Sequence, residues 1–249
     1  MKKKLFWVLT MCLVLALAFT LVACGKGGDD DDESTDNEET GAAFDYDAST
    51  VNTQLVAFQN ANGYIFRYEA TGTQTETGAY TKVSIGAKGD LYYIADDSYE
   101  VYYDLSDENY FVQYSRENNG EWVKETTPYS EYFPKATMKA TVDSSFASHS
   151  GWLTYYENFT SSFGSDTTKT TATVAGRSCD KFSFSAAALT GVGLSMARAS
   201  YSCYVDKSTS ICLKWEYSAT VDGKTESWGL ECKEFNTNPD FTLPTVSEE

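Results

Sequence analysis

From residue 64 onward the chain is a succession of short segments in which apolar and polar residues alternate. The apolar positions are rich in Tyr, Val, Ile and Phe, which favour strands, and turn-forming stretches such as Asn118-Asn119-Gly120 separate the segments. Because strands joined by short turns pair with their neighbours in sequence, the pattern predicts an antiparallel meander. The strands expected in this block span residues 64–71, 77–85, 91–95, 100–105, 110–116 and 122–126.

A short helical period precedes this block. Ser49 or Thr50 can cap a helix whose end is marked by Gly63, since glycine accepts the left-handed conformation common after helices. The apolar residues of this stretch recur at helical spacing and are expected to point inward: Val51, Leu55, Phe58 and Ala61.

The period changes again between Ala136 and Phe163, where there is one glycine and no proline. Trp152, Tyr156, Phe159 and Phe163 fall at i, i+4, i+7 and i+11, which predicts one face of a helix. Strand-like segments then resume at residues 169–175, 177–185, 199–206, 211–220 and 225–235. The expected fold class is therefore mainly β (α+β), with one antiparallel sheet of about ten or eleven strands and two helical stretches, and a sheet of that size normally curls or closes.

The first residues have the form of an export signal. Lysines at positions 2 to 4 are followed by 18 uncharged residues, 5–22. This run ends in Leu21-Val22-Ala23-Cys24, which resembles the bacterial lipobox. In lipobox proteins the signal is cut before the cysteine and the thiol is acylated, so we expect residues 1–23 to be a lipoprotein signal peptide and Cys24 to be lipidated. A plain transmembrane helix is the alternative, since such a run nearly spans a bilayer.

Residues 24–47 are expected to form an acidic, flexible tether that begins at the lipidated cysteine. Residues 25–47 hold ten acidic residues and one lysine, and such a block buries too little apolar surface to fold. The run from Asp29 to Glu33 lacks the alternating ligand spacing of a calcium loop, so a solvated linker is the better interpretation. Two acyl chains give stable anchoring. The sequence thus predicts a lipid-anchored protein on the extracytoplasmic face of the cell membrane, with a β-rich domain in residues 48–249.

The charge balance limits the partners. The chain has 19 basic and 36 acidic residues, and residues 48–249 alone carry 26 acidic and 15 basic groups. We therefore expect no nucleic acid as a partner, because phosphates require a basic surface. The partners that remain are the membrane, a lipid or apolar small molecule, and another envelope protein.

Four cysteines remain in the exported domain, an even number that predicts disulfides: Cys179, Cys203, Cys212 and Cys232. Turns near residues 191, 208 and 222–223 would bring all four into one row across adjacent strands. The favoured pairing joins immediate neighbours, Cys179–Cys203 with Cys212–Cys232, and the next joins Cys179–Cys212 with Cys203–Cys232. A Cys₄ zinc site is the alternative, although no close Cys-x₂₋₄-Cys knuckle is present.

No motif in the chain predicts a reaction. Gly193-Leu194-Ser195-Met196-Ala197 is loosely like a nucleophile elbow, but the one histidine, His149, precedes it, contrary to the order in α/β-hydrolases. Gly191-Val192-Gly193 lacks the third glycine and the helix of a dinucleotide-binding loop. Acidic pairs such as Asp96-Asp97 lie in expected turns, where acidic residues are common. We therefore expect a protein that is not an enzyme and has no catalytic residues, cofactor or metal.

Several strand-and-turn segments of the second half resemble the LolA-like family of exported lipoproteins and lipoprotein carriers. They are GRSCDKF at residues 176–182, YVDK at 204–207 leading into ICLKW at 211–215, and Glu234-Phe235 with Phe241. The resemblance implies an unclosed, strongly curved antiparallel β-barrel, whose concave face is covered by helices and whose apolar interior holds acyl chains. The carriers usually lack a lipobox, and the cysteines are not a general family feature, so a shuttle role is not implied.

Three functions fit these features. In the first, the half-barrel binds an apolar or lipid-like ligand, and the stripe of Trp152, Tyr156, Phe159 and Phe163 lines its lid, although any helix packed on a sheet needs such a stripe for its core. In the second, a sheet face or edge binds another envelope protein. In the third, exposed Tyr and Trp stack on carbohydrate. Neighbouring tyrosines such as Tyr92-Tyr93 and Tyr102-Tyr103 motivate it, because they point to opposite faces of a strand and should leave one of each pair exposed.

Overall fold

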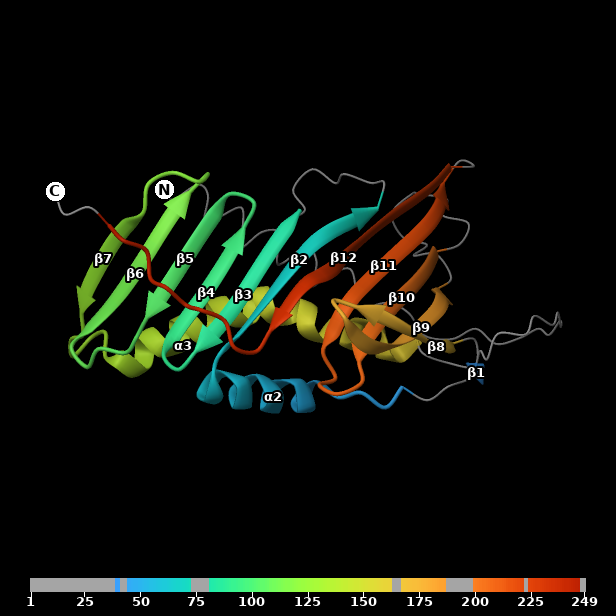
Figure 1. Cartoon of the computed structure of the whole chain (residues 1–249), viewed down its shortest axis with the longest axis horizontal. Coiled ribbons are helices and arrows are strands. Elements are labelled where there is room, and N and C mark those ends of the chain that lie inside the picture. Colours follow the sequence, from blue (N-terminus) through green and yellow to red (C-terminus); the bar gives the residue numbers. More distant parts are fainter. Residues whose placement is uncertain are drawn as a thin grey trace. The chain divides into compact units, whose positions relative to one another are not determined.

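The computed structural model describes residues 39–40, 44–72, 81–162, 167–186, 199–221 and 224–246. The signal, Cys24 and most of the tether lie outside the described residues. Within the described part, twelve strands form one sheet in the order β1-β8-β9-β10-β11-β12-β2-β3-β4-β5-β6-β7 (Figure 1). Every neighbouring pair in this order is antiparallel. The prediction of a mainly β, antiparallel and unclosed sheet is confirmed.

The sheet consists of two blocks of consecutive strands. The first block is a meander of β2 (Tyr64–Gly72), β3 (Lys82–Lys88), β4 (Leu91–Asp96), β5 (Tyr99–Asp104), β6 (Tyr110–Glu117) and β7 (Val123–Pro128). The second contains β8 (Thr168–Val174), β9 (Arg177–Ala186), β10 (Ala199–Asp206), β11 (Cys212–Val221) and β12 (Lys224–Asn236), and the two-residue β1 (Glu39–Thr40) pairs with β8. Pairing of β12 with β2 joins the blocks, so the last strand of the chain lies beside the first long one.

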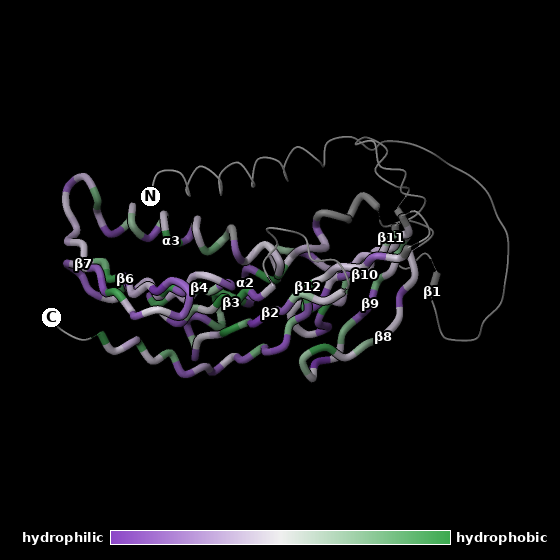
Figure 2. Tube along the Cα trace, turned by 90° about the horizontal axis from the view of Figure 1, so that it is seen from above, coloured by the Kyte–Doolittle hydropathy of each residue, from purple (hydrophilic) through white to green (hydrophobic). Residues whose placement is uncertain are grey.

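Helices cover one face of this sheet, as the LolA-like resemblance implies. The α-helix α3 (Lys135–Ser150) continues into the 3₁₀ segment η1 (Gly151–Ser162), and Figure 2 shows α3 lying along one side of the sheet. α3 packs on β3, β4 and β6, and η1 packs on β11. The helix α2 (Ala48–Ala61) packs against β2, β3 and η1. We call this side the helix-covered face.

The expected first helix is confirmed as α2, with two corrections. Its N-cap is Asp47, whose carboxylate accepts hydrogen bonds from the amide (2.9 Å) and the hydroxyl of Ser49, so Ser49 lies inside the helix. Val51 and Leu55 are buried, whereas Ala61 is exposed. Gly63 follows with φ +83°, the left-handed conformation expected of it.

The core lies between the sheet and the helices and follows the period-two pattern of the strands. Tyr64, Phe66 and Tyr68 of β2 point to the helix-covered face, and Ile85 and Ile94 continue the row of Phe66 across β3 and β4. These residues are all buried, and Val51, Leu55, Val142 and Phe146 of the helices belong to the same core. Alternation thus separates the two faces of β2, whereas every residue of β7 is exposed.

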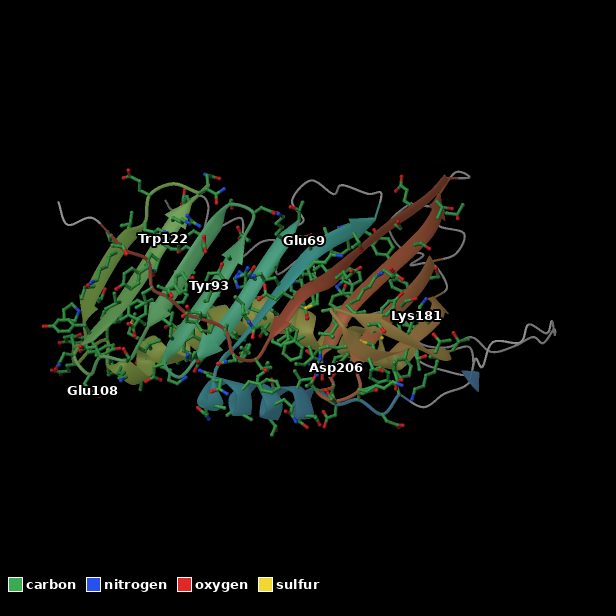
Figure 3. The ribbon with its side chains drawn as sticks, viewed as in Figure 1. Glu69, Tyr93, Glu108, Trp122, Lys181 and Asp206 are labelled. Atoms are coloured by element: carbon green, nitrogen blue, oxygen red, sulfur yellow. The ribbon has the colours of Figure 1, made fainter. Side chains whose placement is uncertain are left out.

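The C-terminal residues 237–246 cross the opposite face of the sheet without forming a strand (Figures 1 and 2). Pro239 is buried, and the ring of Phe241 packs so closely on Gly86 of β3 that a Cβ there would lie 2.8 Å from it. Tyr93, labelled in Figure 3, points to this face and packs on Tyr102 with ring centroids 4.7 Å apart. The expectation that Tyr92 or Tyr93 is exposed was wrong, because Tyr92 is buried on the helix-covered face and Tyr93 is buried on the other.

The ordered domain begins before residue 48. Phe44 and Tyr46, assigned to the tether by the sequence, pack on Phe182 of β9 with ring centroids 4.8 and 5.9 Å from its own. The Tyr46 hydroxyl donates to Asp180 (2.7 Å). Phe44 and Tyr46 therefore belong to the folded domain, because both rings pack on Phe182 and Tyr46 donates to the buried Asp180.

Candidate functional site

A row of four aromatic side chains crosses the helix-covered face from β9 to β12. Phe184, Tyr201, Tyr217 and Trp228 lie opposite one another on successive strands. Their ring centroids are separated by 5.5, 6.0 and 6.3 Å along the row. Phe184 is buried, and the other three are half-buried. Together with Trp215, two residues before Tyr217 on β11, we call this group the aromatic wall.

The segment η1 covers Trp215 of the aromatic wall. Tyr155 stacks on Trp215 with ring centroids 4.2 Å apart, and Trp152 stacks on the same indole at 5.8 Å. Trp228 meets Trp215 edge-on at 4.6 Å. Trp215 is only 4% exposed, and its indole Nε1 has no hydrogen-bond acceptor within the part of the chain that the structure describes. A buried donor without an acceptor costs free energy, so an acceptor brought by a ligand would be favoured at this position.

The two described residues of the expected lid, Trp152 and Tyr156, do not share one face. Trp152 lies on the aromatic wall, but Tyr156 is fully buried elsewhere, donates to the carbonyl oxygen of Ser210 (3.0 Å) and packs on Phe44 with a centroid distance of 5.0 Å. The side chain of Phe159 and the whole of Phe163 lie outside the described residues. The physical reason is that the segment is a 3₁₀ helix with a break at Thr154 (φ −123°), so the spacing of 3.6 residues per turn does not hold. Tyr155, three residues after Trp152, takes the place expected for Tyr156.

The cysteines do not form the expected row. In β9–β10 pairing, Cys203 lies opposite Phe182 and Cys179 opposite Asp206, while Cys212 lies opposite Val205 and not Cys203. All four thiols are free and buried in this structure. Burial raises the pKa of Cys179 to about 11 and that of Cys212 and Cys232 to about 12, so these groups are protonated and unreactive at neutral pH.

Two buried carboxylates, Asp180 and Asp206, form ion pairs on β9 and β10, two of the strands that carry the aromatic wall. Asp206, labelled in Figure 3, accepts hydrogen bonds from Arg177, and Asp180 pairs with Lys169 and Lys207 at 3.0 Å each. Burial alone would raise the pKa of Asp180, but the hydrogen bonds from Tyr46, Lys207 and Lys169 hold it below its usual value. These groups are saturated with partners inside the protein, which is typical of structural rather than catalytic carboxylates.

The described residues contain no assembled catalytic or metal site. Nδ1 of His149 is hydrogen-bonded to the carbonyl oxygen of Ser145 (2.8 Å), and Ser195 lies outside the described residues. No group of His, Cys, Asp and Glu in the described ranges is arranged to hold a metal ion. Among those same residues, no helix has the length and apolar character needed to cross a bilayer.

Comparisons with known proteins give only distant likenesses. No family model matches the chain, and no curated protein matches it. Among solved structures, the lipoprotein LppX of Mycobacterium tuberculosis is 9% identical, with 80% of this chain and 100% of that chain covered and a TM-score of 0.32. The MucA/MucB complex of Pseudomonas aeruginosa is 10% identical over 76% of this chain and 56% of that chain (TM-score 0.25), and MucB alone is 9% identical over 78% and 60% (TM-score 0.28). Identities and TM-scores this low do not transfer the role of any of these proteins to this chain.

Proposed function

We propose that this protein is a lipid-anchored, extracytoplasmic binding protein without enzymatic activity, whose helix-covered face takes an apolar or lipid-like ligand at the aromatic wall. The observation that carries the proposal is the half-buried aromatic row beside Trp215, whose indole N–H has no acceptor among the described residues. Aromatic rings supply a large apolar contact area, and one donor fixes the orientation of a ligand that carries an acceptor, as a carboxyl or ester group does.

Ligand binding is tested on the mature chain, residues 24–249, with Cys24→Ser to prevent acylation. Three of its four tryptophans, at positions 152, 215 and 228, belong to or cover the aromatic wall, so their emission should be transferred to a bound fluorescent fatty acid such as cis-parinaric acid. Tyr217→Ala should weaken this binding, whereas Trp122→Ala, outside the aromatic wall and stacked on Arg116, should not. Absence of probe binding by the unmutated chain, together with no lipid in native mass spectra, would overturn the proposal.

The anchoring part of the proposal rests on the lipobox at Cys24 and the acidic tether that follows it. Changing Cys24→Ala in the full-length protein should abolish both metabolic labelling with a fatty-acid analogue and retention in the membrane fraction. A variant that still fractionates with the membrane and still carries the label would contradict lipidation at this residue.

An interaction module of the envelope is the second candidate, and one observation favours it. Tyr132 is 82% exposed, and the exposed Phe133 follows it in the segment after β7, whose last residue, Pro128, pairs with the exposed Tyr110 of β6. The turn that carries Tyr132 and Phe133 is ordered, since the backbones of Ser130 and Phe133 exchange hydrogen bonds of 3.1 and 3.2 Å. A photo-crosslinking amino acid at position 132 should trap a protein in intact cells if this corner is an interface, and the same probe at the exposed Glu121 serves as the control.

A further inference from the structure

A cleft lies between α2 and α3, and it shares no residue with the aromatic wall. Its floor is formed by Tyr64 of β2 and Tyr92 of β4, and the β3–β4 turn at Gly89 and Asp90 closes one side. The volume of the cleft is about 630 Å³, a size typical of sites for small molecules. Figure 1 shows α2 as a separate helix beside α3, at the ends of β2 and β3.

Hydrogen bonds at the edge of the cleft fix the position of α2. The side-chain amide of Gln59 donates to the carbonyl oxygen of Gly89 (2.6 Å), and the amide of Gly89 donates to the carbonyl oxygen of Gln59 (2.9 Å). This reciprocal pair ties the end of α2 to the β3–β4 turn. A ligand would therefore enter a preformed site and would not have to order it, which lowers the cost of binding.

One part of the lining is apolar. Leu55 and Val56 of α2 face the cleft together with Phe146 of α3, whose ring meets that of Tyr92 edge-on at 5.6 Å. Val56 is 56% exposed, one of few large apolar side chains of the described residues left in solvent. An apolar chain placed in the cleft would cover Val56 and gain the free energy of that burial.

The charged groups of the cleft are already paired with one another. The ammonium group of Lys139 donates to the Tyr92 hydroxyl (2.8 Å) and to both carboxylate oxygens of Asp143 (3.0 Å each), and the Tyr92 hydroxyl donates to Asp143 (3.0 Å). These contacts occupy the three donors of Lys139. Although burial alone would lower the pKa of Lys139, the hydrogen bonds with Tyr92 and Asp143 raise it, so the group stays charged.

The remaining charge in the lining is the carboxylate of Asp90, which leaves the cleft with a net charge of −1 from Lys139, Asp90 and Asp143. An anionic ligand would thus meet a saturated cation and an unpaired carboxylate. A cationic ligand would be attracted by Asp90 alone, because Asp143 is already paired with Lys139. Asp90 is exposed, so water and salt weaken that attraction.

Uncharged polar groups are available instead. The Tyr64 side chain is 1% exposed and lines the cleft, and no hydrogen bond to its hydroxyl is formed within the described part of the chain. Burial raises the pKa of Tyr64, so the hydroxyl keeps its proton. Asn52 and Asn60 add exposed amides from α2. Hydroxyl and amide groups of this kind pair with the hydroxyl groups of a ligand.

We infer that the α2–α3 cleft binds an uncharged amphiphile, with a hydroxyl-bearing head near Tyr64 and an apolar chain across Val56. A glycolipid and a glycerolipid share this chemistry. The inference is independent of the aromatic wall and stands whether or not a fatty acid binds there.

Three probes with the same eight-carbon chain test the inference on the mature chain with Cys24→Ser and Tyr217→Ala, which weakens binding at the aromatic wall, by titration calorimetry below their micellar concentrations. Octyl β-glucoside should bind at least tenfold more tightly than octanoate and octyltrimethylammonium. Equal or tighter binding of either charged probe would overturn the inference in favour of that charge. Undetectable binding of both the glucoside and monooctanoylglycerol at millimolar concentration would also overturn it, whereas binding of monooctanoylglycerol alone would restrict the head group to a glycerol.

Two variants test whether the glucoside binds in the cleft. Tyr64→Phe removes one hydroxyl and should weaken glucoside binding about tenfold, equivalent to one hydrogen bond of about 1.4 kcal/mol. The matched control Tyr93→Phe, on the opposite face, should leave it unchanged. Val56→Trp, at an exposed rim position where folding is not at risk, should fill the cleft and abolish binding. Unchanged affinity in Tyr64→Phe or Val56→Trp would contradict the assignment.

Discussion

Replacing Asp206 by alanine should destabilise the domain more than any change of a surface carboxylate. Asp206 is 2% exposed and accepts hydrogen bonds from Nε (3.0 Å) and Nη2 (2.7 Å) of Arg177 and from the hydroxyls of Ser208 (3.0 Å) and Thr209 (2.5 Å). The guanidinium also lies 4.4 Å from the ring centre of Phe235, against the core. The substitution therefore leaves a cation and two hydroxyls beside the core without their acceptor.

The expected loss follows from what remains behind. Breaking a buried ion pair by removing one partner costs about 3–5 kcal/mol. The Arg177 side chain is 31% exposed, so water can solvate part of it, and the lower end of that range, about 3 kcal/mol, is expected. Asp206→Asn keeps one acceptor oxygen and should cost less, about 1.5–2 kcal/mol, the loss of a charge-assisted hydrogen bond.

Urea unfolding followed by far-UV circular dichroism measures these losses. With a slope of about 2 kcal/mol/M, the midpoint of Asp206→Ala should fall by about 1.5 M. Glu121→Ala, an exposed carboxylate without an ion pair among the described residues, should stay within about 0.5 kcal/mol of the unmutated protein. The double variant with Arg177→Ala should recover part of the loss, because the stranded cation is gone. A loss below 1 kcal/mol in Asp206→Ala, or no recovery in the double variant, would refute the reasoning.

Three further outcomes are expected. Gly229→Ala would place a Cβ 2.3 Å from the carbonyl oxygen of Trp215, so calorimetry should show a stability loss of about 1–3 kcal/mol and weaker probe binding at the aromatic wall; an unchanged melting temperature would contradict this packing. Tyr46→Phe should destabilise the protein at pH 7, and thermal melts at successively lower pH should show this loss shrinking. The folded-state pKa of Asp180 is depressed, so its contribution is present above about pH 3.9 and is lost as the pH falls through its folded pKa. In the reduced protein, stability should fall as the pH rises from about 8.5, where unfolded thiols ionise, toward 11, the folded-state pKa of Cys179; urea melts that show no loss over this range would contradict it.

Local features of the structure could be predicted from the sequence in detail. The expected strand at 199–206 is β10 with the same bounds, and the expected end of α2 at Gly63 is confirmed by its φ of +83°. Both depend on interactions within a few residues, namely alternation along one strand and the conformational freedom of one glycine. The same holds for the core side of β2, where Tyr64, Phe66 and Tyr68 all point inward as their spacing predicts.

The candidate sites depended on contacts that no local pattern contains. The register of β10 places Cys203 opposite Phe182 of β9 and Trp215 of β11, each three residues from the cysteine expected there, which is why the cysteines miss the expected row. Register depends on where each turn is centred, and an offset of a few residues changes every opposite partner.

The sequence by itself determined most of the strands, the first helix and the acidic charge. Only the tertiary structure decided which strands pair and that Tyr155, not Tyr156, covers Trp215. It also decided that α2 and α3 leave a cleft between them, lined by Tyr64 and Tyr92. The physical reason is the range of the interactions. Periodicity and turn chemistry act over a few residues, whereas strand register, a 3₁₀ break at Thr154 and the spacing of two helices are set by side-chain packing across the whole sheet.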